Sequence, residues 1–128
     1  MAESQDKKNR ESKDQGIVLV VCTFRIDKLE QFKQMAKNLN LPGATVTKVL
    51  GFGRQKGHIE LFRGDEYSIE FIDKYKAEML VLEEQVPELL EEIREYLRTG
   101  RIGDGKVYTV SVDKVMRIRT GENGKAAI

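Results

Sequence analysis

The sequence predicts an α+β fold in which two helices cover one face of an antiparallel β-sheet. Three observations carry this prediction. Residues 17–24 form a continuous apolar, β-branched run, two later segments repeat apolar residues at helical spacing, and glycine or proline separates the segments. The resulting order of strand, helix, strand, strand, helix, strand is that of the ferredoxin-like double βαβ arrangement.

The first half of the chain supplies strand, helix and strand. Residues 17–24 are apolar throughout, as expected of a strand that is covered on both faces. Asp27 and Glu30 form a plausible capping pair for a helix over residues 28–38. A Pro-Gly pair then breaks the helix, and residues 44–52 return to the β-branched alternation of a second strand.

The second half repeats this order. Residues 68–82 lack glycine and proline and alternate in part, which predicts a third strand whose start is not sharply marked. The period changes over residues 83–98, whose apolar side chains form one helical stripe. Residues 107–112 predict a fourth strand, and residues 115–128 a further short strand followed by a glycine-containing tail.

Length and composition predict one domain that associates with copies of itself. A chain of 128 residues usually makes one domain with a modest core, and the polar, charged residues 1–16 predict a disordered tail before a domain over residues 17–128. Residues are 40% hydrophobic and 34% charged, and only two helices are expected for a two-faced sheet. We therefore expect a neighbouring subunit to cover the other face.

The net charge of +1 provides no overall basic field, so we do not expect nucleic acid binding. No apolar run approaches the length of about 18 residues that spans a bilayer, and residues 1–16 lack the apolar centre of a secretory signal. These features predict a cytoplasmic protein without direct membrane insertion.

Residue types that carry catalysis are sparse. Cys22 is the only cysteine and lies in an apolar run, so we expect a buried structural side chain and no internal disulfide. His58 is the only histidine, which excludes a histidine-rich metal site. No nucleophile elbow, Cys/His pair or HExxH sequence is present, and an enzyme reading has no evident nucleophile or base.

Three clusters combine glycine with basic residues. The first, residues 51–57, could hold phosphate on close backbone and two cations, but its spacing equally fits a flexible hairpin tip. The second, residues 100–106, satisfies GxxxxGK, yet Val107 replaces the required Ser or Thr and a helix precedes the loop where a P-loop has a strand. A P-loop is excluded, while phosphate binding by amides and cations remains open.

The third cluster contains Arg117 and Arg119, which would share one face of a strand because they are two residues apart. Two guanidinium groups on one face fit an anion. A solvated edge strand whose charges discourage aggregation explains the same pattern.

The chain from about residue 17 to 128 resembles the nitrogen-regulatory PII signalling proteins. "GFGRQKGHIELFRGDEY" at residues 51–67 resembles the long T-loop of that family, "TGRIGDGKVY" at 99–108 its B-loop, and "RIRTGENGKAAI" at 117–128 its C-terminal segment. The resemblance implies a homotrimer whose intersubunit clefts bind ATP or ADP. It thereby joins the three basic clusters into one site.

The resemblance also implies the residues of that site. In the nucleotide site, Arg117 and Arg119 would come from the neighbouring subunit. The full nucleotide set is Thr45, Gly51, Phe52, Gly53, Arg54, Gln55, Glu78, Arg101, Gly103, Asp104, Gly105, Lys106, Arg117 and Arg119.

A second effector, 2-oxoglutarate, is implied to bind only with ATP and Mg²⁺. Gln55 and Lys74 would meet its carboxylates, Lys56 and Gly57 would contribute mainly through backbone, and Gln55 would lie at the metal. A dicarboxylate requires a cation, and Mg²⁺ accepts oxygen ligands from both molecules.

The remaining implications concern regulation. Tyr67 matches a tyrosine that is uridylylated in some bacterial members, although an unmodified strand tyrosine explains it as well; the serine phosphorylated in cyanobacterial relatives is replaced by Asp65. Implied partners include an ammonium transporter, which would recruit the protein to a membrane, and glutamine synthetase or its modifying enzyme.

The alternatives are a divergent PII-like sensor of another small molecule and a slow ATP hydrolase. Arg25-Ile26 replaces the family's common Lys-Pro pair.

Overall fold

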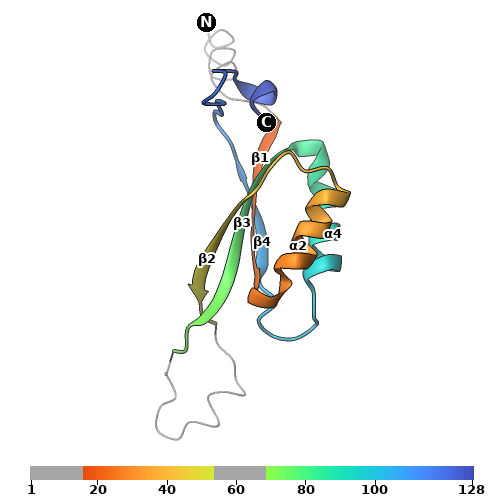
Figure 1. The fold of residues 1–128 in the computed structure, drawn as a ribbon, viewed down its shortest axis with the longest axis vertical. Coiled ribbons are helices and arrows are strands. Elements are labelled where there is room, and N and C mark those ends of the chain that lie inside the picture. Colours follow the sequence, from red (N-terminus) through yellow and green to blue (C-terminus); the bar gives the residue numbers. More distant parts are fainter. Residues whose placement is uncertain (1–15, 54–68) are drawn as a thin grey trace, which may run out of the picture.

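The computed structural model describes residues 16–53 and 69–128. In this part of the chain two α-helices cover one face of a four-stranded antiparallel sheet with the strand order β2-β3-β1-β4, as predicted (Figure 1). The elements are β1 (Ile17–Arg25), α2 (Leu29–Asn38), β2 (Thr45–Gly51), β3 (Ile72–Leu82), α4 (Val86–Leu97) and β4 (Lys106–Ser111), with short 3-10 helices η1 (Ile26–Lys28), η2 (Glu83–Gln85) and η3 (Gly124–Ala127).

Strand β1 is central and divides its side chains between the two faces of the sheet. Val20, Cys22 and Phe24 belong to the core beneath the helices. Their neighbours in the chain, including Thr23 and Arg25, point to the opposite face because strand side chains alternate. We call this opposite face, which neither helix covers, the open face.

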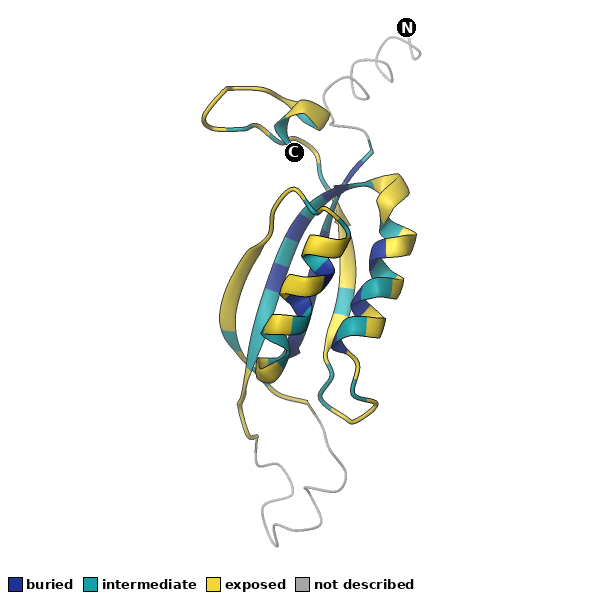
Figure 2. Cartoon of the chain, turned by 45° about the vertical axis from the view of Figure 1, so that its right-hand side comes forward, coloured by how far each residue is buried: buried dark blue, intermediate teal, exposed yellow. Residues whose placement is uncertain are grey.

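The helices contribute the other half of the core. Phe32 and Met35 of α2 and Leu89 and Ile93 of α4 are buried against the sheet (Figure 2). The rings of Phe24 and Phe32 are stacked with their centroids 5.3 Å apart. The helical stripe that the sequence predicted therefore faces the strands.

Several element boundaries differ from the sequence prediction by one to three residues, and α4 begins at Val86 instead of residue 83 because Glu83–Gln85 form the 3-10 helix η2. The first turn after β1 is the 3-10 helix η1, so α2 begins one residue later than expected. Strand β3 begins at Ile72, which locates a start that the sequence did not mark sharply. Short apolar alternation does not by itself locate the residue at which pairing to a partner strand begins.

The short strand predicted after β4 is wrong. Residues 112–128 contain one isolated bridge, between Met116 and Asn123, and the 3-10 helix η3. Gly121 has φ +74°, and its N–H donates to the Arg117 carbonyl at 2.7 Å. This turn folds the chain back on itself, and the turn over residues 118–120 replaces an extended strand.

Gly16, the last residue of the predicted tail, accepts a hydrogen bond at its carbonyl from the Glu83 N–H at 2.7 Å. The rest of that predicted tail, residues 1–15, lies outside the described residues. No helix within the described ranges 16–53 and 69–128 is long and apolar enough to cross a membrane.

A methionine pair tests the core assignment. Met35→Ala should lower the free energy of unfolding by about 2–5 kcal/mol, because it removes buried methylene groups and leaves a cavity. Met116→Ala is the matched control: Met116 is 58% exposed, and its loss should change stability by less than about 0.5 kcal/mol. Urea denaturation at one protein concentration measures both, and equal effects would contradict the core described above.

Candidate ligand-binding site

Polar side chains from neighbouring strands gather on the open face. Thr45 of β2 lies directly opposite Glu78 of β3, so these two predicted site residues share that face. Lys106 of β4 pairs with Thr23 of β1 and points the same way. The sheet therefore places these predicted residues on one face, with Thr45 and Lys106 on its two edge strands.

Asp104 organises the loop of residues 98–105, which joins α4 to β4. Its carboxylate accepts hydrogen bonds at 2.9 Å from the backbone N–H groups of Thr99 and Gly100 and from Arg25 Nε, and a further bond from the Thr99 hydroxyl. The hydrogen bonds from Thr99 and then Arg25 hold the pKa of Asp104 well below its usual range. Asp104 therefore works inside the loop as a charged anchor.

Arg25, at the end of β1, ties the loop to the sheet. Besides Asp104, its guanidinium reaches the Ile102 carbonyl, to which Nη2 donates at 2.7 Å. Arg25 was absent from the predicted site residues. The one sequence feature that could have indicated its role is a basic residue at the end of a mostly apolar strand. Its partners could not be inferred from the sequence, because they lie 77 and 79 positions away.

Lys74 of β3 meets the same loop. Its Nζ donates to the Gly103 carbonyl at 2.7 Å. Burial and then the nearby Arg25 charge lower the pKa of Lys74, while Asp104 acts in the opposite direction. Its stem also lies against Gly51, where an added Cβ would be 3.1 Å from Lys74 Cδ. The structure thus joins the first and second glycine clusters through one lysine.

Two glycines of the loop have backbone conformations that other residues rarely adopt. Gly103 has φ +104° and Gly105 has φ +101°. At Gly105 an added Cβ would lie 1.8 Å from the Thr23 carbonyl oxygen, so the loop can approach β1 only with glycine there. The loop follows α4 and precedes β4, which agrees with the exclusion of a P-loop.

The first glycine cluster is described only in part. The rings of Phe52 and Phe71 meet edge to face with centroids 5.3 Å apart, where the chain leaves β2 and returns toward β3. Gly53 ends this described stretch, and Arg101 is exposed in the 98–105 loop. The predicted roles of Arg54, Gln55, Lys56, Gly57 and Tyr67 fall on residues outside the described ranges.

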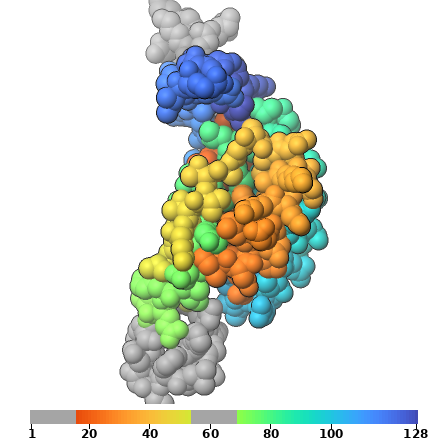
Figure 3. Space-filling model, viewed as in Figure 1, coloured from red at the N-terminus to blue at the C-terminus, as the bar shows by residue number. Residues whose placement is uncertain are grey.

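Arg117 and Arg119 do not lie on one face of a strand, which corrects the third prediction. Arg117 donates to the Ile128 carbonyl at 3.2 Å and pairs with Glu122 at 3.6 Å, while Arg119 is in a turn. The C-terminal segment forms a lobe at the end of the sheet opposite the 98–105 loop (Figures 1 and 3). One chain therefore does not bring these arginines to the other two clusters.

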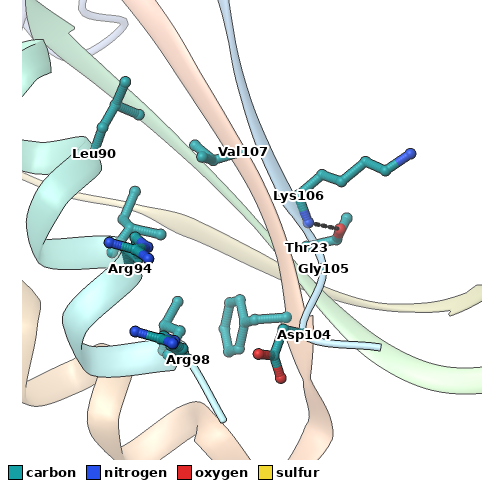
Figure 4. A pocket seen from close by; sticks show the side chains of 11 residues that line it. Thr23, Leu90, Arg94, Arg98, Asp104, Gly105, Lys106 and Val107 are labelled. Atoms are coloured by element: carbon teal, nitrogen blue, oxygen red, sulfur yellow. Dashed lines mark hydrogen bonds between the residues drawn. The ribbon is translucent and has the colours of Figure 1, made fainter. Parts of the chain in front are cut away.

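A pocket of about 360 Å³ lies on the helix face between α4, β1 and the start of β4. Phe24, Leu90 and Val107 line it, together with Asp104. Figure 4 shows the Lys106 side chain extending away from α4, while its backbone N–H donates to the Thr23 hydroxyl at 3.4 Å. The pocket and the Lys106 ammonium thus lie on different sides of β4.

Cys22 is buried, and burial raises its pKa to about 12, which confirms the structural reading of this thiol. Among the residues that the structure describes, no group of three or more His, Cys, Asp or Glu side chains could hold a metal ion.

The fold belongs to the ferredoxin-like α+β class, and its 98–105 loop meets the cations of Arg25 and Lys74 at one end of the sheet. Residues 17–122 match the family model described as nitrogen regulatory protein P-II. The chain therefore belongs to the P-II family of nitrogen regulatory signal transduction proteins. Members of this family regulate other proteins and are not enzymes, so the chain is a regulatory protein.

Individual relatives agree with this assignment. Nitrogen regulatory protein P-II of Pasteurella multocida is 48% identical over 101 residues, covering 79% of this chain and 90% of that protein. Nitrogen regulatory protein GlnK of Escherichia coli K12 is 42% identical over 110 residues, covering 86% and 98%. The crystal structure of Arabidopsis thaliana PII bound to citrate has a TM-score of 0.71 and 32% identity, covering 91% and 94%.

A glycine pair tests the close approach of the loop to β1. Gly105→Ala should destabilise the protein by more than about 2 kcal/mol, because positive φ and overlap with the Thr23 carbonyl act together. Gly100→Ala shares the positive φ but meets nothing within 4 Å, so it should cost only about 1–2 kcal/mol. Chemical denaturation compares them, and an equal cost would argue against the contact.

The Asp104 anchor predicts a pH dependence of stability. Because its folded pKa is depressed, the stability that ionised Asp104 contributes is complete above the ordinary aspartate pKa of about 3.9 and is lost as pH falls below it. The stability difference between the wild type and Asp104→Asn should be constant above about pH 5 and shrink below about pH 4. Urea denaturation across this range measures it, with Asp113→Asn controlling for loss of one negative charge, and a constant difference would refute the anchor.

Proposed function

We propose that this protein is a homotrimeric sensor that binds ATP or ADP and, with Mg²⁺ and ATP, 2-oxoglutarate at clefts between subunits. The observation that carries the proposal is the meeting of Arg25, Lys74 and the 98–105 loop beside the end of β2. Cations and glycine backbone from separate elements converge there, as an anionic ligand requires.

Two observations support the oligomer. The open face carries the exposed apolar residues Tyr108 and Val110 of β4, and neither helix covers it. The C-terminal segment, which contains Arg117 and Arg119, lies at the end of the sheet away from the loop (Figure 1). In the proposed trimer, Arg117 and Arg119 of the partner subunit approach the loop, which a single chain does not achieve.

The loop residues fit a phosphate-bearing ligand. Gly103 and Gly105 leave the backbone without covering Cβ atoms, and Lys106 supplies a cation beside them. In the proposed nucleotide site Gly103–Lys106 hold phosphates, with Gly51, Phe52 and Gly53 on the other side and Thr45 and Glu78 toward the base and ribose. The negative charge of Asp104 is taken up by donors of Arg25 and Thr99 within the protein.

Lys74 supports the dicarboxylate part of the proposal. It is a partly buried cation beside a second cation, Arg25, and an arriving carboxylate would relieve their repulsion. One solved relative, the Arabidopsis protein, is described as bound to citrate, also a polycarboxylate. Mg²⁺, when bound, would neutralise phosphate charge and accept carboxylate oxygens. Gln55, Lys56 and Gly57 complete this proposed site.

Regulation follows from the position of the site at the base of residues 54–68. A ligand held at that base would change the conformations open to the segment that docks on partners. We assign this docking to an ammonium transporter, to glutamine synthetase or to the enzyme that modifies it. Uridylylation of Tyr67 would add charge and bulk to the docking segment. The protein would act in the cytoplasm, with residues 1–16 as a tail on a domain of residues 17–128.

Calorimetry tests the order of ligand binding. In the wild type, 2-oxoglutarate should produce binding heat with Mg²⁺ and ATP present and none without nucleotide. Lys106→Ala should weaken ATP binding about tenfold or more through the loss of one charged phosphate contact. Equal 2-oxoglutarate affinity with and without nucleotide would sink the proposal.

Lys37→Ala is the control for Lys106→Ala. Lys37 is an exposed lysine in the last turn of α2, on the helix side of the sheet. Its loss removes the same charge from the molecule and should leave ATP affinity within about twofold, because surface charge at this distance is screened. If both substitutions weaken ATP equally, the effect belongs to net charge and not to the loop.

A further inference from the structure

Lys74 lies between Gly51 and the 98–105 loop, and its ammonium group already donates one hydrogen bond within the protein. An ammonium group has three N–H donors, of which one goes to the Gly103 carbonyl. Within residues 16–53 and 69–128 no other hydrogen bond of this ammonium is formed, so two donors remain for a ligand there. The stem is confined on the other side by the backbone of Gly51. The place at which Lys74 offers its free donors is therefore set by the position of the Gly103 carbonyl.

The Gly103 carbonyl is in turn set by its neighbours in the chain. Arg25 holds the Ile102 carbonyl before it and the Asp104 carboxylate after it. Asp104 also accepts from the backbone of Thr99, at the start of the loop. Gly103 lies between two anchored residues, and even a Cβ there would come within 3.3 Å of Arg25 Nη2.

We propose that Asp104, braced by Arg25, is a positioning residue that couples the two ligands of this site. A phosphate bound by the loop steadies the Gly103 carbonyl, and this carbonyl places the Lys74 ammonium for a carboxylate. The inference rests on the proposed function, because it assigns a route between its two ligands. This route runs through protein hydrogen bonds and adds to any bridging by Mg²⁺.

Variants of the full chain separate this route from simple loss of nucleotide. Each variant is titrated with 2-oxoglutarate by calorimetry at Mg²⁺-ATP tenfold above its own ATP dissociation constant. Asp104→Asn should weaken 2-oxoglutarate about tenfold under these conditions. Lys37→Ala, which removes an exposed cation on the helix side of the sheet, should bind 2-oxoglutarate within about twofold of wild type under the same conditions.

Two further variants guard the comparison. Arg25→Lys keeps the charge but offers one ammonium where the guanidinium reached both Asp104 and Ile102, so it should also weaken 2-oxoglutarate, by about three- to tenfold. This milder change keeps the test valid if Asp104→Asn folds poorly. Lys33→Gln removes an exposed ion pair with Glu30 on α2 and should change nothing.

A spectroscopic readout separates positioning from general stability. NMR titration of lysine labelled at Cε, with the Lys74 signal assigned through Lys74→Arg, follows this ammonium directly. Arg25→Gln should raise the pKa of Lys74, because a neighbouring positive charge is lost. Asp104→Asn should lower it further, because a negative charge is lost. If the substitutions only loosened the loop, Lys74 would become less buried and its pKa would rise in both variants.

The outcomes distinguish failure of the coupling route from failure of the proposed function. If ATP-saturated Asp104→Asn and Arg25→Lys bind 2-oxoglutarate within twofold of wild type, the coupling route is overturned and the proposed function stands. If wild-type protein binds no 2-oxoglutarate at any Mg²⁺-ATP concentration, the proposed function itself fails. A selective loss in the Asp104 and Arg25 variants, with opposite shifts of the Lys74 pKa, supports the route.

Discussion

The hydrogen-bonded carboxylate of Asp104 holds together the end of the molecule at which the candidate site lies. It takes N–H donors from the loop that contains it and a guanidinium donor from β1, so one side chain fixes both the loop and its distance from the sheet. Each of these hydrogen bonds is charge-assisted and favours the ionised carboxylate. The pKa of Asp104 therefore lies well below its usual range. The position of Gly103, and through it that of Lys74, depends on this anchor.

The sheet supplies the rigid frame on which this anchor works. Arg25 and Lys74 lie opposite each other in the β1–β3 register, so their side chains emerge side by side on the open face. Two cations at neighbouring positions repel each other unless anions separate them. Asp104 provides part of that negative charge within the chain, and the proposed ligands would provide the rest. The same arrangement explains why a basic cluster is tolerated in a protein of nearly balanced charge.

Hydrophobic periodicity predicted the helices and the buried strand well, whereas alternation did not predict a strand where no neighbouring strand was available to pair with it. The apolar run located β1 to within one residue, and the apolar stripe located α4 to within three residues, because burial of one face dictates their period. The segment of Arg117 and Arg119 had strand-like alternation yet forms a turn closed by Gly121. Alternation there had no neighbouring strand to pair with, and without a ladder it does not make a strand.

By itself the sequence determined the fold class, the family and the glycines of the 98–105 loop, since each depends on local periodicity, on contiguous motifs or on the conformational freedom of one residue type. Only the tertiary structure decided that Arg25 belongs to the site and that Lys74 is tied to Gly103. These contacts join residues 79 and 29 positions apart. No local pattern encodes such pairs, because the strand register and the crossover through α4, not sequence spacing, bring their atoms within hydrogen-bonding distance.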